Sequence, residues 1–92
     1  MPEPAFVPSC AVSGSGSPLL LLNGYAGTAA DWDPVFLGEL CRHREVLAVD
    51  HRGMGATPRG EGPITIDVLA RDALALLDDR GLGRVDVAGW SM

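Results

Sequence analysis

Three short apolar segments occur in the sequence, separated by stretches long enough to hold a helix. Residues 19–22 are four consecutive leucines, residues 46–49 read Val-Leu-Ala-Val and residues 85–88 read Val-Asp-Val-Ala. A short apolar run bounded by Gly, Pro or polar residues is typical of a strand buried on both faces of a parallel sheet. We therefore expect a strand at each of these places.

Two helices are predicted between these strands. Asp33 and Pro34 form an N-cap followed by proline in the first turn, which starts a helix that runs to about Arg42. Thr65 caps a second helix, and Gly81 ends it. Helical spacing predicts that one apolar face of this second helix is buried and that its charged residues lie elsewhere. The face comprises Ile66, Leu69, Ala70, Ala73, Leu74 and Leu77, and the charged residues are Asp72, Asp78, Asp79 and Arg80.

The first 17 residues form a poorly defined lead-in. Prolines interrupt the start, and a short strand is predicted only near residues 10–12. Residues 13–18 are rich in Ser and Gly and are predicted to be a loop, as are residues 51–63, which are rich in Gly and Pro. Residues 1–92 are therefore expected to belong to a single domain.

Strands that alternate with helices predict an α/β fold, with a mainly parallel sheet and crossover helices. In such sheets, ligands bind beyond the carboxyl ends of the strands. Residues 23–28, 50–57 and 89–92 are polar or glycine-rich, and each segment follows a predicted strand. We expect the functional residues in these three segments.

The charged residues exclude several classes of function. Seven basic and twelve acidic residues give a net charge of −5, and all seven basic residues are Arg. Without Lys, the chain has neither a P-loop lysine nor a Schiff-base lysine. Without a basic cluster, it is not expected to bind nucleic acid.

No targeting or membrane segment is expected. The longest strongly apolar run, residues 19–22, is far shorter than the roughly 20 residues that span a bilayer. The N-terminus lacks the cationic start and long apolar stretch of a secretory signal, which favours a cytoplasmic protein.

No cofactor or metal is expected. Cys10 and Cys41 are interpreted as reduced, structural thiols, and no cluster has metal-ligand spacing. Gly53 and Gly55 follow a strand but lack the third glycine and the helix of a dinucleotide-binding turn. The two tryptophans, Trp32 and Trp90, are better explained by packing and pocket lining than by cofactor binding.

Three sequence segments in a fixed order carry a family resemblance. Residues 18–25 read Pro-Leu-Leu-Leu-Leu-Asn-Gly-Tyr, residues 47–57 read Leu-Ala-Val-Asp-His-Arg-Gly-Met-Gly-Ala-Thr, and residues 85–92 read Val-Asp-Val-Ala-Gly-Trp-Ser-Met. From about Ser15 to the end, the chain resembles the α/β-hydrolase superfamily. The segments are similar to its third strand and His-Gly-aromatic turn, its fourth strand and Asp-x-Arg-Gly-x-Gly-x-Ser loop, and its fifth strand and Gly-x-Ser-x-Gly nucleophile elbow. Asn23 and Thr57 replace a His and a Ser of that pattern, and both keep hydrogen-bonding capacity.

The resemblance implies roles at the first and last segments. Ser91 would be the catalytic nucleophile, and the backbone N–H groups of Tyr25 and Met92 would form the oxyanion hole. Taken alone, Gly-x-Ser-x occurs in many turns, and an aromatic residue such as Tyr25 can simply pack over its loop. The catalytic roles therefore depend on the fold.

The middle segment is expected to be structural. The resemblance implies that Asp50, Arg52, Gly53 and Gly55 form a loop in which Asp50 and Arg52 tie the loop to the strand ends. Asp50 is followed directly by His51, and neighbours on an extended chain point to opposite faces. We therefore do not interpret them as a catalytic pair.

The implied activity belongs to a longer protein. In the family, the catalytic acid and His follow the serine, so this chain is interpreted as an N-terminal portion that lacks both. Full length, the protein is expected to be a serine hydrolase acting on a small-molecule ester. Members of the family with this elbow also include lactonases, carbon–carbon bond hydrolases and cofactor-free haloperoxidase-like enzymes, whereas a serine disfavours the branches that use Asp as nucleophile. The 92-residue chain is expected to be inactive and to self-associate through the exposed edge of its last strand. The alternative is a truncated product that is not catalytic, or that binds a partner.

Overall fold

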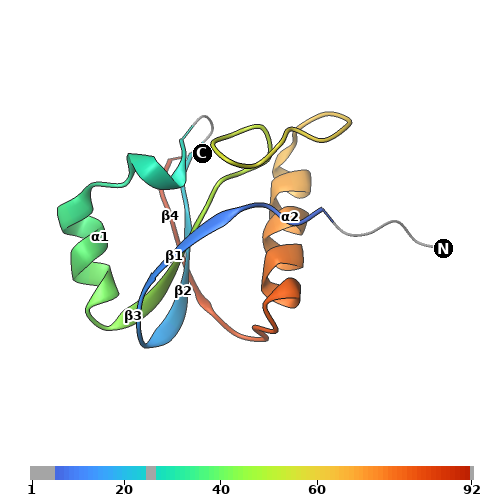
Figure 1. Ribbon diagram of the computed structural model, residues 1–92. Helices are drawn as coiled ribbons and strands as arrows, with labels where there is room; N and C mark the ends of the chain where they lie inside the picture. Colours follow the sequence, from blue (N-terminus) through green and yellow to red (C-terminus); the bar gives the residue numbers. More distant parts are fainter. Residues whose placement is uncertain (1–5, 25–26, 92) are drawn as a thin grey trace.

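A four-stranded sheet lies between two helices (Figure 1). The computed structural model describes residues 6–24 and 27–91. Along the chain, the elements are β1 (Cys10–Gly14), β2 (Ser17–Leu22), a short 3-10 helix η1 (Ala29–Asp31), α1 (Pro34–Cys41), β3 (Arg44–Val49), α2 (Ile66–Asp79) and β4 (Asp86–Gly89). The predicted α/β fold is confirmed.

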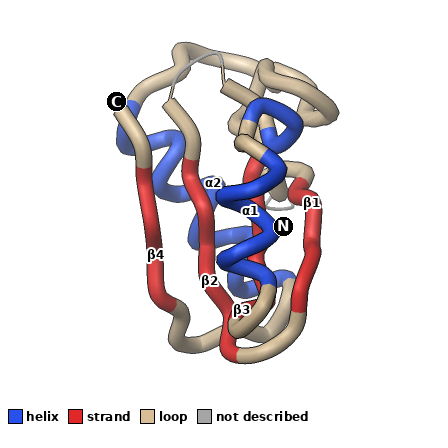
Figure 2. Tube along the Cα trace, turned by 90° about the vertical axis from the view of Figure 1, so that its left-hand side faces the viewer, coloured by secondary structure: helices blue, strands red, loops and turns tan. Residues whose placement is uncertain are grey.

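The sheet is mostly parallel. The strand order is β1-β3-β2-β4, so β1 and β4 are the outer strands (Figure 2). β2 pairs in parallel with both β3 and β4, whereas β1 pairs antiparallel with β3. The three parallel strands are those predicted from the apolar runs. Among the described residues, no strand pairs with the outer edge of β4.

Both faces of the sheet are covered, which explains the unbroken run of leucines in β2. Side chains of successive strand residues point to opposite faces, so a strand covered on both sides needs apolar residues at every position. On the face of α2, Leu20 packs with Leu47, Val49, Ala73 and Leu76. On the face of α1, Leu19 and Leu21 pack with Val46 and Ala48, and Trp32, Leu37 and Leu40 cover them.

The loop prediction for residues 13–18 is wrong. β1 continues through Gly14 and β2 begins at Ser17, which leaves only Ser15 and Gly16 between them. Because β3 lies between β1 and β2, this connection crosses the start of β3. Gly16 has a φ of +128°, and a Cβ there would collide with the backbone carbonyl of His43. The Ser and Gly residues therefore serve a tight crossing rather than a long loop.

Both helix starts are confirmed. The Asp33 side chain accepts a hydrogen bond from the Phe36 N–H at 3.2 Å, at the start of α1. Thr65 Oγ1 accepts one from the Val68 N–H, also at 3.2 Å, at the start of α2. These bonds satisfy N–H groups that the first turn of a helix leaves without an internal partner.

The predicted buried face of α2 is only partly right. Ile66 and Leu74 are 61% and 62% exposed, whereas Asp72 is buried. The buried residues Leu69, Asp72, Ala73 and Leu76 also recur at helical spacing. The helix is turned so that Asp72 faces inward, where Arg52 neutralises it. The ion pair with Arg52 thus explains why the face that contains Asp72 is buried and not the fully apolar face that was predicted.

Candidate active site

The carboxyl ends of the three parallel strands lie at one level. Leu22 of β2 is opposite Val49 of β3 and opposite Gly89 of β4. Beyond the strand, the Trp90 N–H donates to the Leu22 carbonyl at 3.1 Å. The three segments that were expected to hold the functional residues therefore begin side by side at one edge of the sheet.

Ser91 follows β4 in a backbone conformation that is rare for serine. Its φ is +69°, and among the described residues it is the only non-glycine residue with a positive φ. A non-glycine residue in this region is strained by about 1–3 kcal/mol and is held there by its surroundings. The residue is exposed. A strained, exposed serine at a strand end is what a nucleophile elbow requires.

The turn after β2 lies directly against Ser91. A Cβ added to Gly24 would be 3.0 Å from Ser91 Cβ, 3.3 Å from Ser91 Oγ and 3.4 Å from the Trp90 carbonyl oxygen. Such contacts are tighter than ordinary van der Waals distances, so a side chain at this position would push the turn away. Glycine therefore lets the turn after β2 approach the serine.

Asn23 organises this turn. Its Oδ1 accepts a hydrogen bond from the Gly24 N–H at 2.8 Å, and its Nδ2 donates to the Thr28 carbonyl at 3.3 Å. The Gly27 N–H donates to the Gly24 carbonyl at 3.0 Å. Asn23 stands where the family pattern has His, and its amide makes bonds on both sides of the turn.

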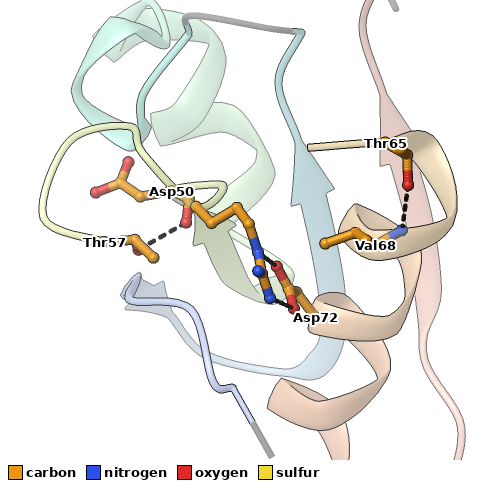
Figure 3. A network of polar contacts seen from close by, with 6 residues as sticks. Asp50, Thr57, Thr65, Val68 and Asp72 are labelled. Atoms are coloured by element: carbon orange, nitrogen blue, oxygen red, sulfur yellow. Dashed lines mark hydrogen bonds and ion pairs between the residues drawn. The ribbon is translucent and has the colours of Figure 1, made fainter. Parts of the chain in front are cut away.

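Asp50 binds the backbone of two different segments. Its Oδ1 accepts from the Ala29 N–H at 2.7 Å, and its Oδ2 accepts from the Ala56 N–H at 3.0 Å. Its backbone carbonyl accepts from Thr57 Oγ1 at 2.7 Å (Figure 3). At Gly55, where φ is +50°, a Cβ would collide with the Asp50 carboxylate. The carboxylate therefore holds the loop together, whereas a reactive group would need its oxygens free.

The loop prediction is wrong in one part. Arg52 ties the loop to α2 and not to the strand ends. Its Nε and Nη2 donate to the two carboxylate oxygens of Asp72 at 2.7 and 2.6 Å (Figure 3). Both residues are buried, and Cζ of Arg52 lies 4.0 Å from the centroid of the Phe6 ring. The hydrogen bond with Asp72 raises the pKa of Arg52 above its ordinary value.

Gly53, the remaining residue of the predicted loop, makes the turn itself. Its φ is +81°, and its N–H donates to the Thr57 carbonyl at 3.1 Å. A left-handed conformation of this kind is open to glycine at little cost.

Two cavities adjoin Ser91 and its neighbours. One, of about 190 Å³, is lined by Ser91 and His51 together with Ile66 and Ala70 of α2. This position explains the exposure of Ile66, because its side chain borders the cavity instead of the core. The second is lined in part by Trp32, which stacks with Phe36 at a centroid distance of 5.8 Å. Trp90 borders both cavities, as expected for a pocket-lining residue.

Two predicted site residues, Tyr25 and Met92, lie outside the described residues. Within residues 6–24 and 27–91, Ser91 makes no hydrogen bond to a histidine side chain. His51 borders the same cavity, but its Nε2 lies 3.2 Å from the carbonyl oxygen of Asn23. No role at the site is predicted for His51 from the sequence. The signal that could have found it is its place after a buried strand, at the edge of the sheet where ligands bind.

The described residues offer neither a membrane helix nor a metal site. None of the helices in them combines the length and apolar character needed to cross a bilayer. No group of three or more His, Cys, Asp and Glu side chains in the same residues could hold a metal ion.

Comparison with known proteins identifies the family. Residues 19–92 match the model of the alpha/beta hydrolase family. The chain is 38% identical over 81 residues to RutD of Azorhizobium caulinodans, whose name proposes a carbamate hydrolase, and the match covers 88% of this chain but 30% of that protein.

Solved structures agree with this match. A hydrolase from Pseudomonas aeruginosa superposes with a TM-score of 0.81 at 36% identity, over 89% of this chain and 31% of the other. The enol-lactonase from Burkholderia xenovorans superposes with a TM-score of 0.83 at 30% identity, over 91% of this chain and 34% of the other. The chain thus spans about a third of the length of these relatives. With its level strand ends, its strained serine and its bonded Asp50 loop, the chain belongs to the alpha/beta hydrolase family.

Proposed function

We propose that the complete protein is a serine hydrolase that cleaves carboxylic esters, with Ser91 as its nucleophile. The observation that carries this proposal is the position of Ser91, exposed and strained at the end of β4 and in contact with the turn at Gly24. A serine that packs only for stability has no need of a left-handed backbone or of a glycine turn against its side chain. The proposal accounts for both features.

The reaction proceeds in two steps. Ser91 Oγ attacks the ester carbonyl carbon, the bond to the alcohol oxygen breaks, and an acyl-serine forms as the alcohol leaves with a proton. Water then attacks the acyl-serine and releases the acid. In this proposal, the backbone N–H groups of Tyr25 and Met92 stabilise the negative charge that develops on the carbonyl oxygen.

A base must remove the hydroxyl proton of Ser91, and no base lies within hydrogen-bonding distance of it among the described residues. In the family's chain order, the acid and the His follow the serine. Because this chain spans about 30% of its relatives, we propose that both come from the rest of the complete protein. The 92 residues alone would then be inactive.

The names of the relatives support the substrate class. One relative is named for carbamate hydrolysis and one for an enol-lactone, which is a cyclic ester. Both substrates contain an acyl carbon bonded to oxygen or nitrogen. We propose a small-molecule ester as the substrate and no cofactor.

A fluorophosphonate probe, which labels activated serines, tests the proposal. The protein expressed from its complete reading frame is expected to be labelled stoichiometrically, and Ser91→Ala to abolish labelling. Ser15→Ala, which changes an exposed serine between β1 and β2, is the matched control and keeps it. The 92-residue chain is expected to react at least about a thousandfold more slowly, because no base activates the serine.

Two results decide against the proposal. Labelling that persists in Ser91→Ala would assign the reactive serine elsewhere. A folded complete protein that takes up no label would favour the alternative, a protein without catalytic activity that binds a partner.

A further inference from the structure

His51 is buried and bonded at one ring nitrogen. It is 6% exposed, and its Nε2 lies 3.2 Å from the carbonyl oxygen of Asn23. A carbonyl oxygen only accepts hydrogen bonds, so Nε2 must carry the proton. In the neutral ring, Nδ1 is then the unprotonated nitrogen, and it has no hydrogen-bond partner among the described residues. The contact therefore fixes one tautomer of the ring.

The residue that His51 binds is the centre of the turn after β2. The Asn23 side chain accepts a hydrogen bond from the Gly24 N–H at 2.8 Å and donates one to the Thr28 carbonyl at 3.3 Å. These bonds are local and fix the shape of the turn. The bond from His51 comes from a residue 28 positions later in the chain. Together with the bond from the Ala29 N–H to Asp50 Oδ1, it fixes where the turn lies relative to β3 and its loop.

The position of the turn determines the space around Ser91. Gly24 is so close that an added Cβ would lie 3.3 Å from Ser91 Oγ. The residue after Gly24 is Tyr25, the proposed oxyanion-hole donor. A shift of the turn would therefore change both the room beside the nucleophile and the position of a backbone donor.

We propose that His51 is a positioning residue, whose Nε2–H holds the Asn23 carbonyl and thereby sets the turn at Gly24 against Ser91. The proposal rests on the proposed function, since the position of the turn affects catalysis only if Ser91 reacts. His51 does not act as the general base, because neither of its ring nitrogens makes a hydrogen bond to Ser91 within the described residues.

Two substitutions at His51 separate positioning from proton transfer. In the complete protein, His51→Leu removes the donor, whereas the amide nitrogen of Gln in His51→Gln lies close to where Nε2 was. We expect His51→Leu to lower kcat for ester hydrolysis about 10- to 100-fold, with KM within about twofold. We expect His51→Gln to stay within about threefold of the wild type, because it still donates. A general base would be lost in both variants.

His43→Leu is the matched control. His43 is the other histidine of the chain and is exposed at the end of α1. Its replacement is expected to leave kcat within about twofold of the wild type. The proposal is overturned if folded His51→Leu hydrolyses esters as fast as the wild type, or if His51→Gln is as slow as His51→Leu.

A spectroscopic measurement tests positioning without any reaction and without a variant that must fold. In the ¹⁵N-histidine-labelled complete protein, long-range ¹H–¹⁵N correlations are expected to show His51 protonated at Nε2 and not at Nδ1. The opposite tautomer overturns the proposal whatever the activity. An inert Ser91 together with the expected tautomer overturns the proposed function and leaves the contact between His51 and the turn supported.

Discussion

The loop after β3 and the end of β4 lie at the same edge of the sheet but differ in how they are held. In the loop, Asp50 is bonded through both carboxylate oxygens, and Arg52 is paired with Asp72 in the interior. At β4, Val87 is 58% exposed and Trp90 is 70% exposed. The charged groups of the loop thus find their partners within this chain, whereas no strand among the described residues pairs with the outer edge of β4.

The loop after β3 and the end of β4 therefore have different roles, the first structural and the second proposed to be catalytic. The hydrogen bonds of Asp50 hold the segment after β2 and the loop after β3 together, and we assign no reactive group to the loop. Among the described residues, Ser91 is the only non-glycine residue with a positive φ, and a strained residue persists only where neighbouring structure holds it. Four predictions test this division. The first three apply to the complete protein and the last to the 92-residue chain.

The largest effect is expected at the ion pair between the loop and α2. Asp72→Ala leaves Arg52 buried without its partner, which should lower the free energy of unfolding by about 3–5 kcal/mol. Urea denaturation measures this. Glu39→Ala, in the exposed pair with Arg42, is the control and should cost no more than about 0.5 kcal/mol. Equal losses in the two variants would show that the loop is not held from α2.

A smaller loss is expected inside the loop. Gly55→Ala places a methyl group against the Asp50 carboxylate and should cost about 2–3 kcal/mol. Gly62→Ala is the control, because Gly62 also has a positive φ of +83° but has no atom within 4 Å of the added Cβ. It should cost about 1 kcal/mol. The difference in stability between the two variants, obtained from their melting curves, measures the cost of the clash with Asp50. Equal stabilities would show that the Asp50 carboxylate does not occupy this position.

At the serine, two replacements should differ in their free energy of unfolding. Glycine adopts a positive φ at little cost and alanine does not, so Ser91→Gly should be about 1 kcal/mol more stable than Ser91→Ala. Both variants lose the proposed nucleophile, so thermal unfolding compares them without a difference in reactivity. Identical stabilities would mean that the serine is not strained.

The smallest effect on stability is expected at the open edge, where we propose that the 92-residue chain self-associates. Val87→Lys adds a charge to β4 and should reduce association in sedimentation experiments, while the free energy of unfolding changes by about 0.5 kcal/mol or less. Val12→Lys, on the other outer strand, is the control and should leave association unchanged. A wild-type chain that is monomeric and melts cooperatively would contradict this proposal.

Local signals explain what the sequence could predict. Asp33 and Thr65 cap the helices through bonds that span three residues, and the leucines of β2 need only a covered sheet. The strained serine followed from the resemblance at Gly89 and Ser91, because a nucleophile elbow has a fixed backbone conformation. Each of these features depends on a few consecutive residues.

Features that depend on distant partners were missed. Asp72 reads as a surface residue until its partner Arg52, 20 residues earlier, is known. The bond from His51 to Asn23 joins residues 28 apart, and neither residue type alone indicates it. The crossing at Gly16 was interpreted as a loop, because its glycine is required by the approach of His43 and not by a turn.

The crossing between β1 and β2 also orders events during synthesis. β3 lies between these two strands, so neither has its partner until residues 44–49 have left the ribosome. The strands cannot form an early hairpin with each other, and the leucines of β2 emerge uncovered. Pairing across such distances is slow, and exposed apolar segments aggregate in the meantime. The leucines of β2, three of which later form the core, therefore stay uncovered until β3 has been made.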